Sequence, residues 1–187
     1  SQINSNSNIT LSAGNTGVMF VISRMLLKTI DTVSKPALAG LWPSKKGMNV
    51  VLDLGANVEC DEKNLVDFSE MGAALFKSLF PLEDPKVALL NIGSEEIKGT
   101  DSLKKAYSKL KKISHYGDFD FNGFIEGNEL MNGDSNVIVT DGFTGNVALK
   151  TAEGTANFIT SELKNAMTGT LLGKISSLLN ISNLRKF

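Results

Sequence analysis

The feature that most constrains the fold is a unit that occurs four times along the chain. Each unit is a short apolar run, a loop that contains glycine, and a longer stretch with apolar residues at helical spacing. Such alternation is typical of layered α/β domains in which most strands are parallel. The glycine loops are AGNTG at 13–17, GANVECDE at 55–62, GSEEIKGT at 93–100 and GFTGN at 142–146. The sequence therefore predicts one α/β domain over residues 1–187.

The apolar runs predict the strands, and the stretches after the loops predict the helices. The strands are ITLS at 9–12, MNVVLDL at 48–54, KVALLNI at 86–92 and SNVIVTD at 135–141. The helices run onward from Val18, from Leu65 to Leu79, over 102–113 and over 147–166. Apolar residues surround nearly the whole first helix, so we expect it to be buried. The near-continuous apolar run at 87–90 indicates a sheet covered on both faces.

Three segments lie outside this pattern. Residues 118–133 predict an extra strand and a short helix or turn, whereas 31–47, with its prolines and glycines, predicts a long connection or an excursion onto a partner subunit. Residues 168–187 predict an amphipathic helical segment. Its apolar face, a surface for a membrane, a partner subunit or the core, consists of Leu171, Leu172, Ile175, Leu178 and Leu179.

The composition disfavours several classes of function. Nineteen Lys and Arg residues are balanced by 20 Asp and Glu residues, so no basic excess is present to neutralise nucleic-acid phosphates. No stretch of the sequence is apolar for the roughly 18 residues that a spanning helix requires. The lone Cys60 has no partner for an internal disulfide, so we expect a reducing, cytoplasmic compartment. Because the chain begins with Ser1, we also expect it to be a piece of a longer chain.

The glycine loops are the best candidates for a functional site. In an open parallel sheet, the loops after the strands lie at the carboxyl edge, where ligands bind. We therefore expect the four loops to converge on one cleft. Each loop precedes a helix N-terminus, which favours an anion such as phosphate or an oxyanion. No loop has the spacing of a nucleotide-binding P-loop or of a dinucleotide fingerprint.

Small polar residues and glycines in these loops are the predicted phosphate- or acyl-binding residues. Individually, the same residue types are common in turns and helix caps, but four such loops together favour a site. The set comprises Gly14, Asn15, Thr16, Gly17, Asn57, Gly93, Glu96, Gly142, Thr144, Gly145 and Asn146.

Two charged residues are the strongest catalytic candidates. Lys98 lies beside Glu95 and Glu96 in a loop bracketed by glycines, although such a lysine is also compatible with a solvated ion pair. Asp141 directly precedes Gly142. It is either a helix cap or a carboxylate that orients or deprotonates an attacking phosphate.

The only histidine and the only cysteine are weaker candidates. His115 has no second histidine with which to form a metal cluster, and we expect a surface role. Cys60 precedes a predicted helix start, where its pKa is lowered if the helix activates it. The alternative is a small buried hydrophobic residue. We expect no metal site.

Taken in order, the four loops resemble those of the bacterial phosphate acyltransferases, the PlsX family. The matching segments run from Leu11 to Gly154: LSAGNTG, LDLGANVEC, LLNIGSEEIKGT, FIEGNEL and NGDSNVIVTDGFTGNVALKTAEG. The resemblance implies a three-layer α/β/α sandwich like that of phosphotransacetylases and isopropylmalate dehydrogenases. It also implies a homodimer that transfers a fatty acyl group from acyl carrier protein to inorganic phosphate, giving acyl phosphate for phospholipid synthesis.

The resemblance assigns roles to particular residues. The catalytic lysine of the family's EExKG loop falls on Lys98, and the aspartate of its DGFTGN motif falls on Asp141. No cofactor is implied beyond the pantetheine arm of the donor protein. Family members associate peripherally with the inner membrane face, so the apolar face of 168–187 is expected to contact lipid, with Lys174, Arg185 and Lys186 attracting anionic groups.

The sequence also departs from the family, which leaves alternatives open. The family begins with a strand and a DAMGGD-like turn that are absent here, and it continues beyond the position of Phe187. We therefore expect a fragment of a longer family domain. The alternatives are a phosphotransacetylase that uses acyl-CoA and a non-catalytic module that binds carrier protein or membrane. An isopropylmalate-type dehydrogenase is disfavoured, because an arginine clamp and a metal-binding aspartate cluster are missing.

Overall fold

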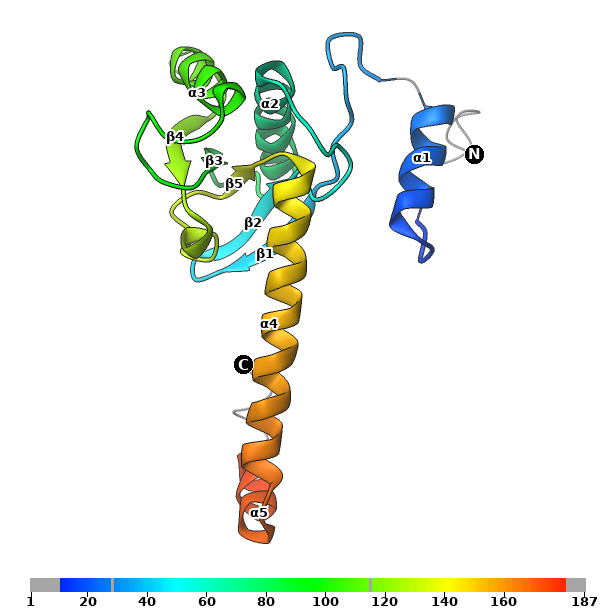
Figure 1. Ribbon diagram of the computed structural model, residues 1–187, viewed down its shortest axis with the longest axis vertical. Coiled ribbons are helices and arrows are strands. Elements are labelled where there is room, and N and C mark those ends of the chain that lie inside the picture. The colour runs from blue at the N-terminus through cyan, green and yellow to red at the C-terminus, as the bar shows by residue number, and fades with distance from the viewer. Residues whose placement is uncertain (1–10, 28, 115, 181–187) are drawn as a thin grey trace. The chain divides into compact units, whose positions relative to one another are not determined.

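The computed structural model describes residues 11–27, 29–114 and 116–180. It divides into two compact units, the first ending at Asn146 and the second beginning at Val147. Helix α1 (Thr16–Leu26) precedes the alternating strands and helices of the first unit, and α4 (Gly142–Thr168) runs from its last residues into the second unit (Figure 1). The second unit also contains α5 (Leu171–Leu179). The prediction of one domain stays a prediction.

The first unit is built on a mainly parallel sheet. In the described part of the chain the sheet has five strands in the order β1-β2-β5-β3-β4. β5 pairs in parallel with β2 and with β3, and β4 pairs in parallel with β3. The strands are β1 (Gly40–Ser44), β2 (Gly47–Leu52), β3 (Lys86–Leu90), β4 (Asp120–Ile125) and β5 (Val137–Val139). The predicted α/β class with a mainly parallel sheet is confirmed.

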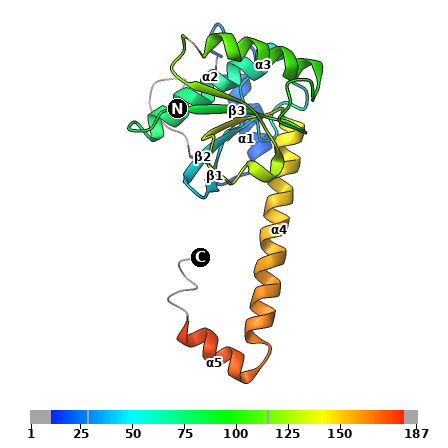
Figure 2. The same cartoon turned by 90° about the vertical axis from the view of Figure 1, so that its left-hand side faces the viewer.

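Two helices pack side by side on this sheet: α2 (Glu62–Leu79) and α3 (Asp101–Ile113) (Figures 1 and 2). Asp61 caps α2 by accepting from the Asn64 N–H at 2.8 Å, and the Asn64 side chain accepts from the Asp61 N–H in return. α2 approaches the sheet closely at Gly72, because a Cβ there would lie 2.6 Å from a Val137 methyl carbon. The glycine thus sets the distance between helix and sheet.

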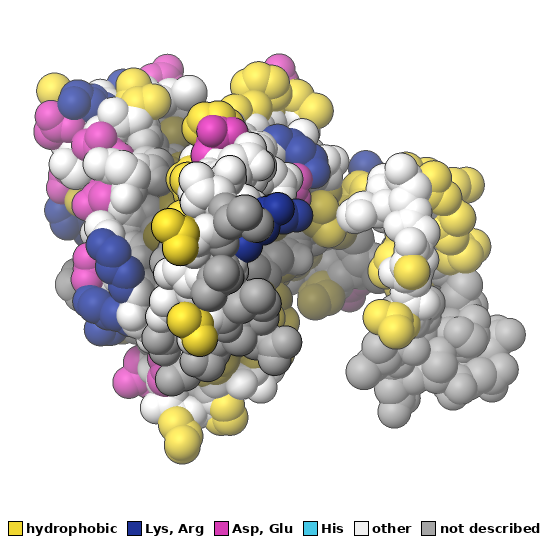
Figure 3. Space-filling view, turned by 90° about the horizontal axis from the view of Figure 1, so that it is seen from below, with side chains coloured by type: hydrophobic (Ala, Val, Ile, Leu, Met, Phe, Trp, Pro, Cys, Tyr) yellow, Lys and Arg dark blue, Asp and Glu magenta, His cyan; other side chains and the backbone are white. Residues whose placement is uncertain are grey.

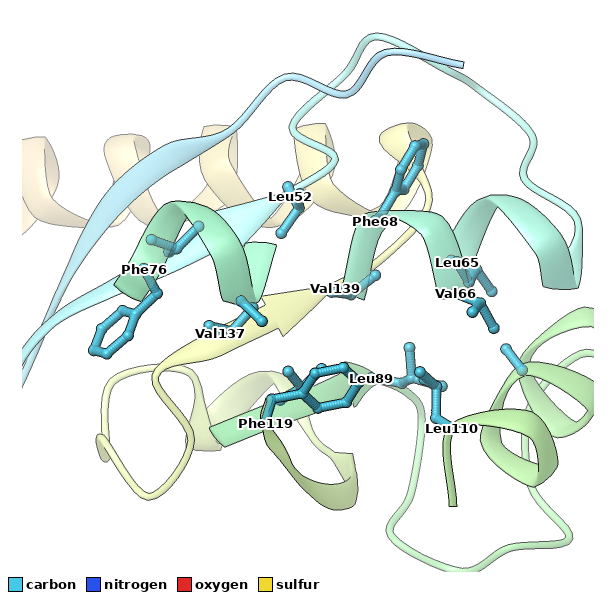
Figure 4. Packing of buried hydrophobic residues seen from close by; sticks show 14 of the residues in the cluster. Leu52, Leu65, Val66, Phe68, Phe76, Leu89, Leu110, Phe119, Val137 and Val139 are labelled. Atoms are coloured by element: carbon cyan, nitrogen blue, oxygen red, sulfur yellow. The ribbon is translucent and has the colours of Figure 1, made fainter. Parts of the chain in front are cut away.

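The core lies between these helices and the sheet (Figure 4). Phe68 and Phe76 of α2 and Leu110 of α3 are almost fully buried against strand residues such as Leu89 and Val139. The last four residues of β3, Val87 to Leu90, are all buried, as expected for a strand covered on both faces. The core thereby fixes the strand ends from which the candidate loops leave.

The segment predicted as a long connection contains a strand, so that prediction is wrong for 40–44. β1 pairs antiparallel with β2 through the turn at 45–46, with Trp42 opposite Asn49. Trp42 is buried between the exposed Leu41 and Pro43. This is the alternation of an edge strand, where a proline is tolerated because its missing N–H faces away from the ladder.

The first predicted unit differs most from the structure. Leu11 and Ser12 are not in a strand, and the remainder of the predicted strand 9–12 lies outside the described residues. α1 begins at Thr16 and buries none of its residues, so the expected burial is wrong for the described structure. Most apolar side chains of α1 are exposed at its surface (Figure 3). Apolar residues on all sides of a helix indicate that its burial is favourable, but they do not specify which element or partner buries it.

The prediction of a loop at 142–146 is also wrong, because these residues form the first turn of α4. Between β3 and β5, the predicted extra strand is β4, and the predicted short helix is η2 (Gly127–Glu129). Within 168–187, α5 accounts for the predicted helical segment, whereas 181–187 lie outside the described residues. Among the described helices, none combines the length and apolar character needed to cross a bilayer.

Candidate functional site

Three of the four segments predicted as loops follow strands that end at the same edge of the sheet, although the one at 142–146 is the start of α4. β2 ends at Leu52, β5 at Val139 and β3 at Leu90, and the three strands are parallel neighbours in that order. Their carboxyl ends therefore lie together, the position at which α/β sheets bind ligands. Because β5 is the middle strand, Asp141 lies between the loop that follows Leu52 and the loop that follows Leu90.

The fourth predicted loop forms the start of α1. The Gly14 N–H donates to the Ser12 hydroxyl, and the Asn15 side chain caps α1 by accepting from the Val18 N–H at 3.1 Å. Thr16 and Gly17 form the first turn of the helix. Among the described residues, no hydrogen bond or ion pair joins this loop to the other three, so their convergence is not seen.

Asp53, which the sequence analysis missed, organises the loop after β2. Its side chain is fully buried. Oδ1 accepts from the backbone N–H groups of Leu38, Gly55 and Ala56 at 2.9–3.1 Å, and Oδ2 accepts from the backbone and side-chain N–H groups of Asn57, each at 2.8 Å. A signal for Asp53 was present, because this aspartate lies at the end of an apolar run two residues before Gly55, much as Asp141 ends an apolar run directly before Gly142.

The predicted binding residue Asn57 serves this same loop. Besides its bonds to Asp53, its side-chain Nδ2 donates to the Pro36 carbonyl at 2.8 Å, and its own carbonyl accepts from the Gly142 N–H at 2.8 Å. Asn57 is buried. It therefore connects the loop after β2 to the N-terminus of α4 and to the chain that leads into β1.

Two predicted glycines allow α4 to begin against this loop. A Cβ at Gly142 would lie 2.5 Å from the Asn57 carbonyl oxygen, and a Cβ at Gly145 would overlap the Asp53 carbonyl oxygen. No side chain fits at either place. The neighbouring Asn146 lies beside Gly55, whose φ of +128° is a conformation that favours glycine. The structure thus brings Asn57, Gly142, Gly145 and Asn146 together.

Asp141 caps α4 by accepting hydrogen bonds from Thr144, another of the predicted site residues. Its Oδ1 accepts from the Thr144 backbone N–H and its Oδ2 accepts from the Thr144 hydroxyl, each at 2.8 Å. The capping alternative therefore describes its contacts in this structure. Asp141 remains partly exposed at the carboxyl edge of the sheet.

Lys98 lies over Gly93 in the loop after β3. A Cβ at Gly93 would overlap the Lys98 Cδ and lie 2.7 Å from its ammonium. The Lys98 Nζ is 2.9 Å from the Glu95 Oε2, and both side chains are about half exposed. The pKa of Lys98 is raised, chiefly by its hydrogen bond to Glu95 and by that charge, with a further contribution from Glu126. The same hydrogen bond lowers the pKa of Glu95.

Asn91 holds the backbone of the Lys98 loop from below. Its side-chain Nδ2 donates to the Lys98 carbonyl at 3.1 Å, and its backbone N–H donates to Ile125 at the end of β4. Its Oδ1 lies under Gly99, where φ is +91° and a Cβ would overlap it. The buried Oδ1 has no hydrogen-bond partner among the described residues. Sequence reasoning did not identify Asn91 as part of the site.

Glu96, predicted to bind phosphate or the acyl group, makes its contacts with α3. Its Oε1 accepts from the Tyr107 hydroxyl at 2.7 Å and from the Lys111 ammonium at 2.9 Å. These two contacts, the hydrogen bond from Tyr107 first, lower the pKa of Glu96. The adjacent glutamates therefore bind different partners, Glu95 the candidate lysine and Glu96 the helix.

The remaining candidates lie elsewhere or outside the described part. Burial raises the pKa of Cys60 to about 11, which favours its role as a small apolar residue. Leu172 and Leu179 are both 80% exposed, whereas the side chains of Leu171, Ile175 and Leu178 are not described. His115, Arg185 and Lys186 lie outside the described residues. No cluster of three or more metal-binding side chains occurs in the described ranges.

A hollow of about 910 Å³ lies at the opposite edge of the sheet. It is lined by the carboxyl-terminal half of α2 and by residues before β3 and β4, such as Asp84 and Phe119. None of the predicted site residues lines it. The candidate site is therefore defined by the strand ends and not by this hollow.

Comparison with known proteins gives a consistent match. The model of the family described as "Fatty acid synthesis protein" matches residues 3–187. A phosphate acyltransferase of Pelagibacter ubique (strain HTCC1062) is 68% identical over 97% of this chain and 54% of its own length. A phosphate acyltransferase of Rhizobium etli is 44% identical over 91% of this chain and 49% of its own length. The chain thus spans about half the length of these relatives.

Two solved structures that share the fold are phosphotransacetylases. The EutD phosphotransacetylase from Staphylococcus aureus aligns with a TM-score of 0.57 at 19% identity, covering 72% of this chain and 46% of its own. A phosphotransacetylase from Streptococcus pyogenes aligns with the same score at 16% identity, covering 77% and 49%. At these identities the likeness shows the fold alone.

Proposed function

Because this chain belongs to the fatty acid synthesis protein family, we propose that it acts as a phosphate acyltransferase that moves a fatty acyl group from acyl carrier protein to inorganic phosphate. The observation that carries the proposal is the strand order β2-β5-β3. This order sets Asp141 between the Asp53–Asn57 loop and the Lys98 loop. The product is acyl phosphate, which feeds phospholipid synthesis.

The reaction requires positioning and charge more than an enzyme nucleophile. A phosphate oxygen attacks the thioester carbon, a C–O bond forms, the C–S bond breaks, and the electron pair of that bond leaves with the pantetheine sulfur as a thiolate that takes up a proton. The transition state develops an oxyanion on the carbonyl oxygen, so fixed donors at that place lower the barrier. No metal or nucleotide enters this balance.

In this scheme Lys98 and Asp141 have complementary roles. The Lys98 ammonium exchanges its hydrogen bond with Glu95 for one with phosphate or with the developing oxyanion. Asp141 orients or deprotonates the phosphate while Thr144 fixes its two oxygens. Asn146 and the loop N–H groups complete the phosphate cradle, and Asn57 supports it through Asp53.

The first experiment traps acyl phosphate with hydroxylamine, using the purified chain, inorganic phosphate and palmitoyl carrier protein, with palmitoyl-CoA as a second donor. We expect phosphate-dependent product from the carrier-protein donor. Product from acyl-CoA alone would support the phosphotransacetylase alternative. Binding of carrier protein without product from either donor would support the non-catalytic alternative.

A pair of lysine variants tests the site. Lys98→Ala is expected to lower turnover by about a hundredfold or more, the usual effect of removing a donor to a developing oxyanion. Lys150→Ala is the matched control, because Lys150 also forms an exposed (i, i+3) ion pair, with Glu153 at 2.7 Å, but lies in the second unit. Turnover of Lys98→Ala within tenfold of the unchanged chain would contradict the assigned role.

The proposed partners are acyl carrier protein, a second copy of the chain and the inner face of the membrane, with which the chain associates from the cytoplasm. The membrane proposal rests on α5, where Leu172 and Leu179 are exposed and Lys174 is also exposed. We expect Leu172→Asp with Leu179→Asp to abolish flotation with anionic vesicles. Leu82→Asp, at a 99% exposed leucine of the first unit, is the control; unchanged flotation of the double variant would contradict the proposal.

A further inference from the structure

The contacts of Glu96 suggest a function for α3 that the proposed chemistry does not use. Glu96 is two residues before Lys98, and its carboxylate joins the loop to Tyr107 and Lys111. The three side chains are here called the α3 clasp. The clasp connects the loop that carries the candidate lysine to a helix whose Ala106 and Leu110 are fully buried.

Tyr107 gives the clasp a rigid base. Its ring lies 4.8 Å from the ring of Phe124 and 5.3 Å from that of Phe121, both in β4. Gly123, with φ at +86°, leaves room for this ring, because a Cβ there would lie 3.3 Å from it. The Tyr107 hydroxyl is therefore held by aromatic packing against the sheet before it donates to Glu96.

Lys111 closes the clasp from the other side. Its ammonium is 2.9 Å from the Glu96 Oε1 and 5.5 Å from the centre of the Tyr107 ring. An ammonium at this distance over a ring is favourable. The carboxylate of Glu96 thus accepts two hydrogen bonds from groups that are themselves in contact.

The clasp and Asn91 together leave the Lys98 loop little freedom. Asn91 holds the Lys98 carbonyl, and the Lys98 N–H donates to the Glu95 carbonyl at 3.0 Å. Gly93 and Gly99 bracket the loop. Release of Glu96 from α3 would free the loop between these glycines and permit Glu96 to compete with Glu95 for the Lys98 ammonium.

We propose that Tyr107 and Lys111 are positioning residues, which fix Glu96 on α3 and thereby set the place of the Lys98 ammonium at the carboxyl edge of the sheet. The proposal rests on the proposed function. It assigns Glu96 to loop placement, in contrast to phosphate binding. A second glutamate on Lys98, in addition to Glu95, would oppose the approach of a phosphate, so the attachment of Glu96 to α3 also keeps this additional negative charge away from the Lys98 ammonium.

The test combines Tyr107→Phe with Lys111→Met, which removes both donors but keeps the ring and most of the lysine stem. We expect kcat to fall by about ten- to a hundredfold through misplacement of Lys98, with KM for the carrier protein unchanged. We also expect the backbone amides of 93–99 to exchange with deuterium at least about tenfold faster. Lys111→Arg alone retains a charged donor and leaves Tyr107 in place. This variant is expected to keep kcat and the exchange of 93–99 close to those of the unchanged chain.

Lys109→Met is the matched control. Lys109 is another lysine of α3, and its ion pair, at 3.4 Å, is with Glu62 of α2 and not with the loop. It is expected to change neither kcat nor the exchange of 93–99. Faster exchange of this segment in the double variant, even if the unchanged chain proves inactive, supports loop placement while the proposed function fails. Unchanged exchange together with kcat within twofold would overturn the inference.

Discussion

At the scale of single residues, Gly142 and Gly145 show how closely α4 approaches the loop after β2. The carbonyl oxygens of Asn57 and Asp53 occupy the space that side chains at these glycines would need. Each contact is with backbone, which cannot rotate away as a flexible side chain can. The two glycines are therefore required for the place of the α4 N-terminus, and through it for the place of Asp141.

Gly145→Ala is accordingly expected to destabilise the protein by about 1–3 kcal/mol, the usual cost of overpacking. The measurement is the midpoint of urea unfolding. Gly154→Ala is the control, because a Cβ at this α4 position meets nothing within 4 Å, and alanine there is expected to favour the helix by about 1 kcal/mol. Equal unfolding midpoints for the two variants would show that the close approach is not required.

The surroundings of Cys60 determine the reactivity of its thiol. Burial raises its pKa to about 11, although a backbone hydrogen bond at Gly142 acts in the opposite direction. With a pKa of about 11 in place of the ordinary 9.0, the Cys60 thiol carries about a hundredfold less thiolate at pH 8.

We therefore expect iodoacetamide to alkylate Cys60 at pH 8 at least about tenfold more slowly than a free cysteine peptide. Denaturation in urea should restore the peptide rate. Rapid alkylation of the folded chain would instead support a thiol activated by the start of α2.

At the scale of secondary-structure elements, α4 depends on Asp141 for its first turn, and the proposed catalysis depends on the same carboxylate. Variants separate the two roles. Asp141→Ala removes the cap and is expected to cost about 0.5–2 kcal/mol of stability as well as activity. Asp141→Asn keeps an acceptor for the Thr144 N–H, so we expect most of the stability to remain while the rate falls by about a hundredfold.

Thermal unfolding and the hydroxylamine assay, applied to both variants, measure the two properties independently. Thr144→Ser, which retains the hydroxyl and the backbone N–H, is the control and is expected to behave like the unchanged chain. If Asp141→Asn turns over within twofold of the unchanged chain, the residue is a helix cap alone.

At the scale of the whole molecule, stability is expected to be unevenly distributed. β3 and β5 lie inside the sheet, and their apolar residues are almost completely buried. In contrast, the buried residues of α4 are Gly142 and Gly145, and the later Phe158, Ile159 and Leu163 are exposed.

In a dilute, monomeric sample we expect the amides of β3 and β5 to exchange with deuterium at least about a hundredfold more slowly than those of α4 after Val147. Hydrogen exchange followed by mass spectrometry measures both regions in one experiment. If protection of α4 rises with protein concentration, a second copy covers it, which would support the homodimer proposal. Equal protection in the dilute sample would contradict the uneven distribution.

Much of the molecule was predictable from sequence, because local patterns report local structure. The apolar run at 87–90 and the helical spacing from Leu65 to Leu79 led to β3 and α2, and the glycine loops led to the family. The edge strand β1 was missed, because Pro43 and the flanking glycines resemble a connection until pairing with β2 is known. Asp53 was missed because its importance depends on the backbone N–H groups that surround it.

The α/β class, the glycine loops after β2 and β3 and the family followed from the sequence, since apolar period and short motifs are properties of neighbouring residues. The tertiary structure alone decided that β5 lies between β2 and β3, that Asp53 is buried under the α4 N-terminus, and that Glu96 binds α3 while Glu95 binds Lys98. These features depend on strand pairing and packing between residues far apart in the chain, which no local pattern encodes.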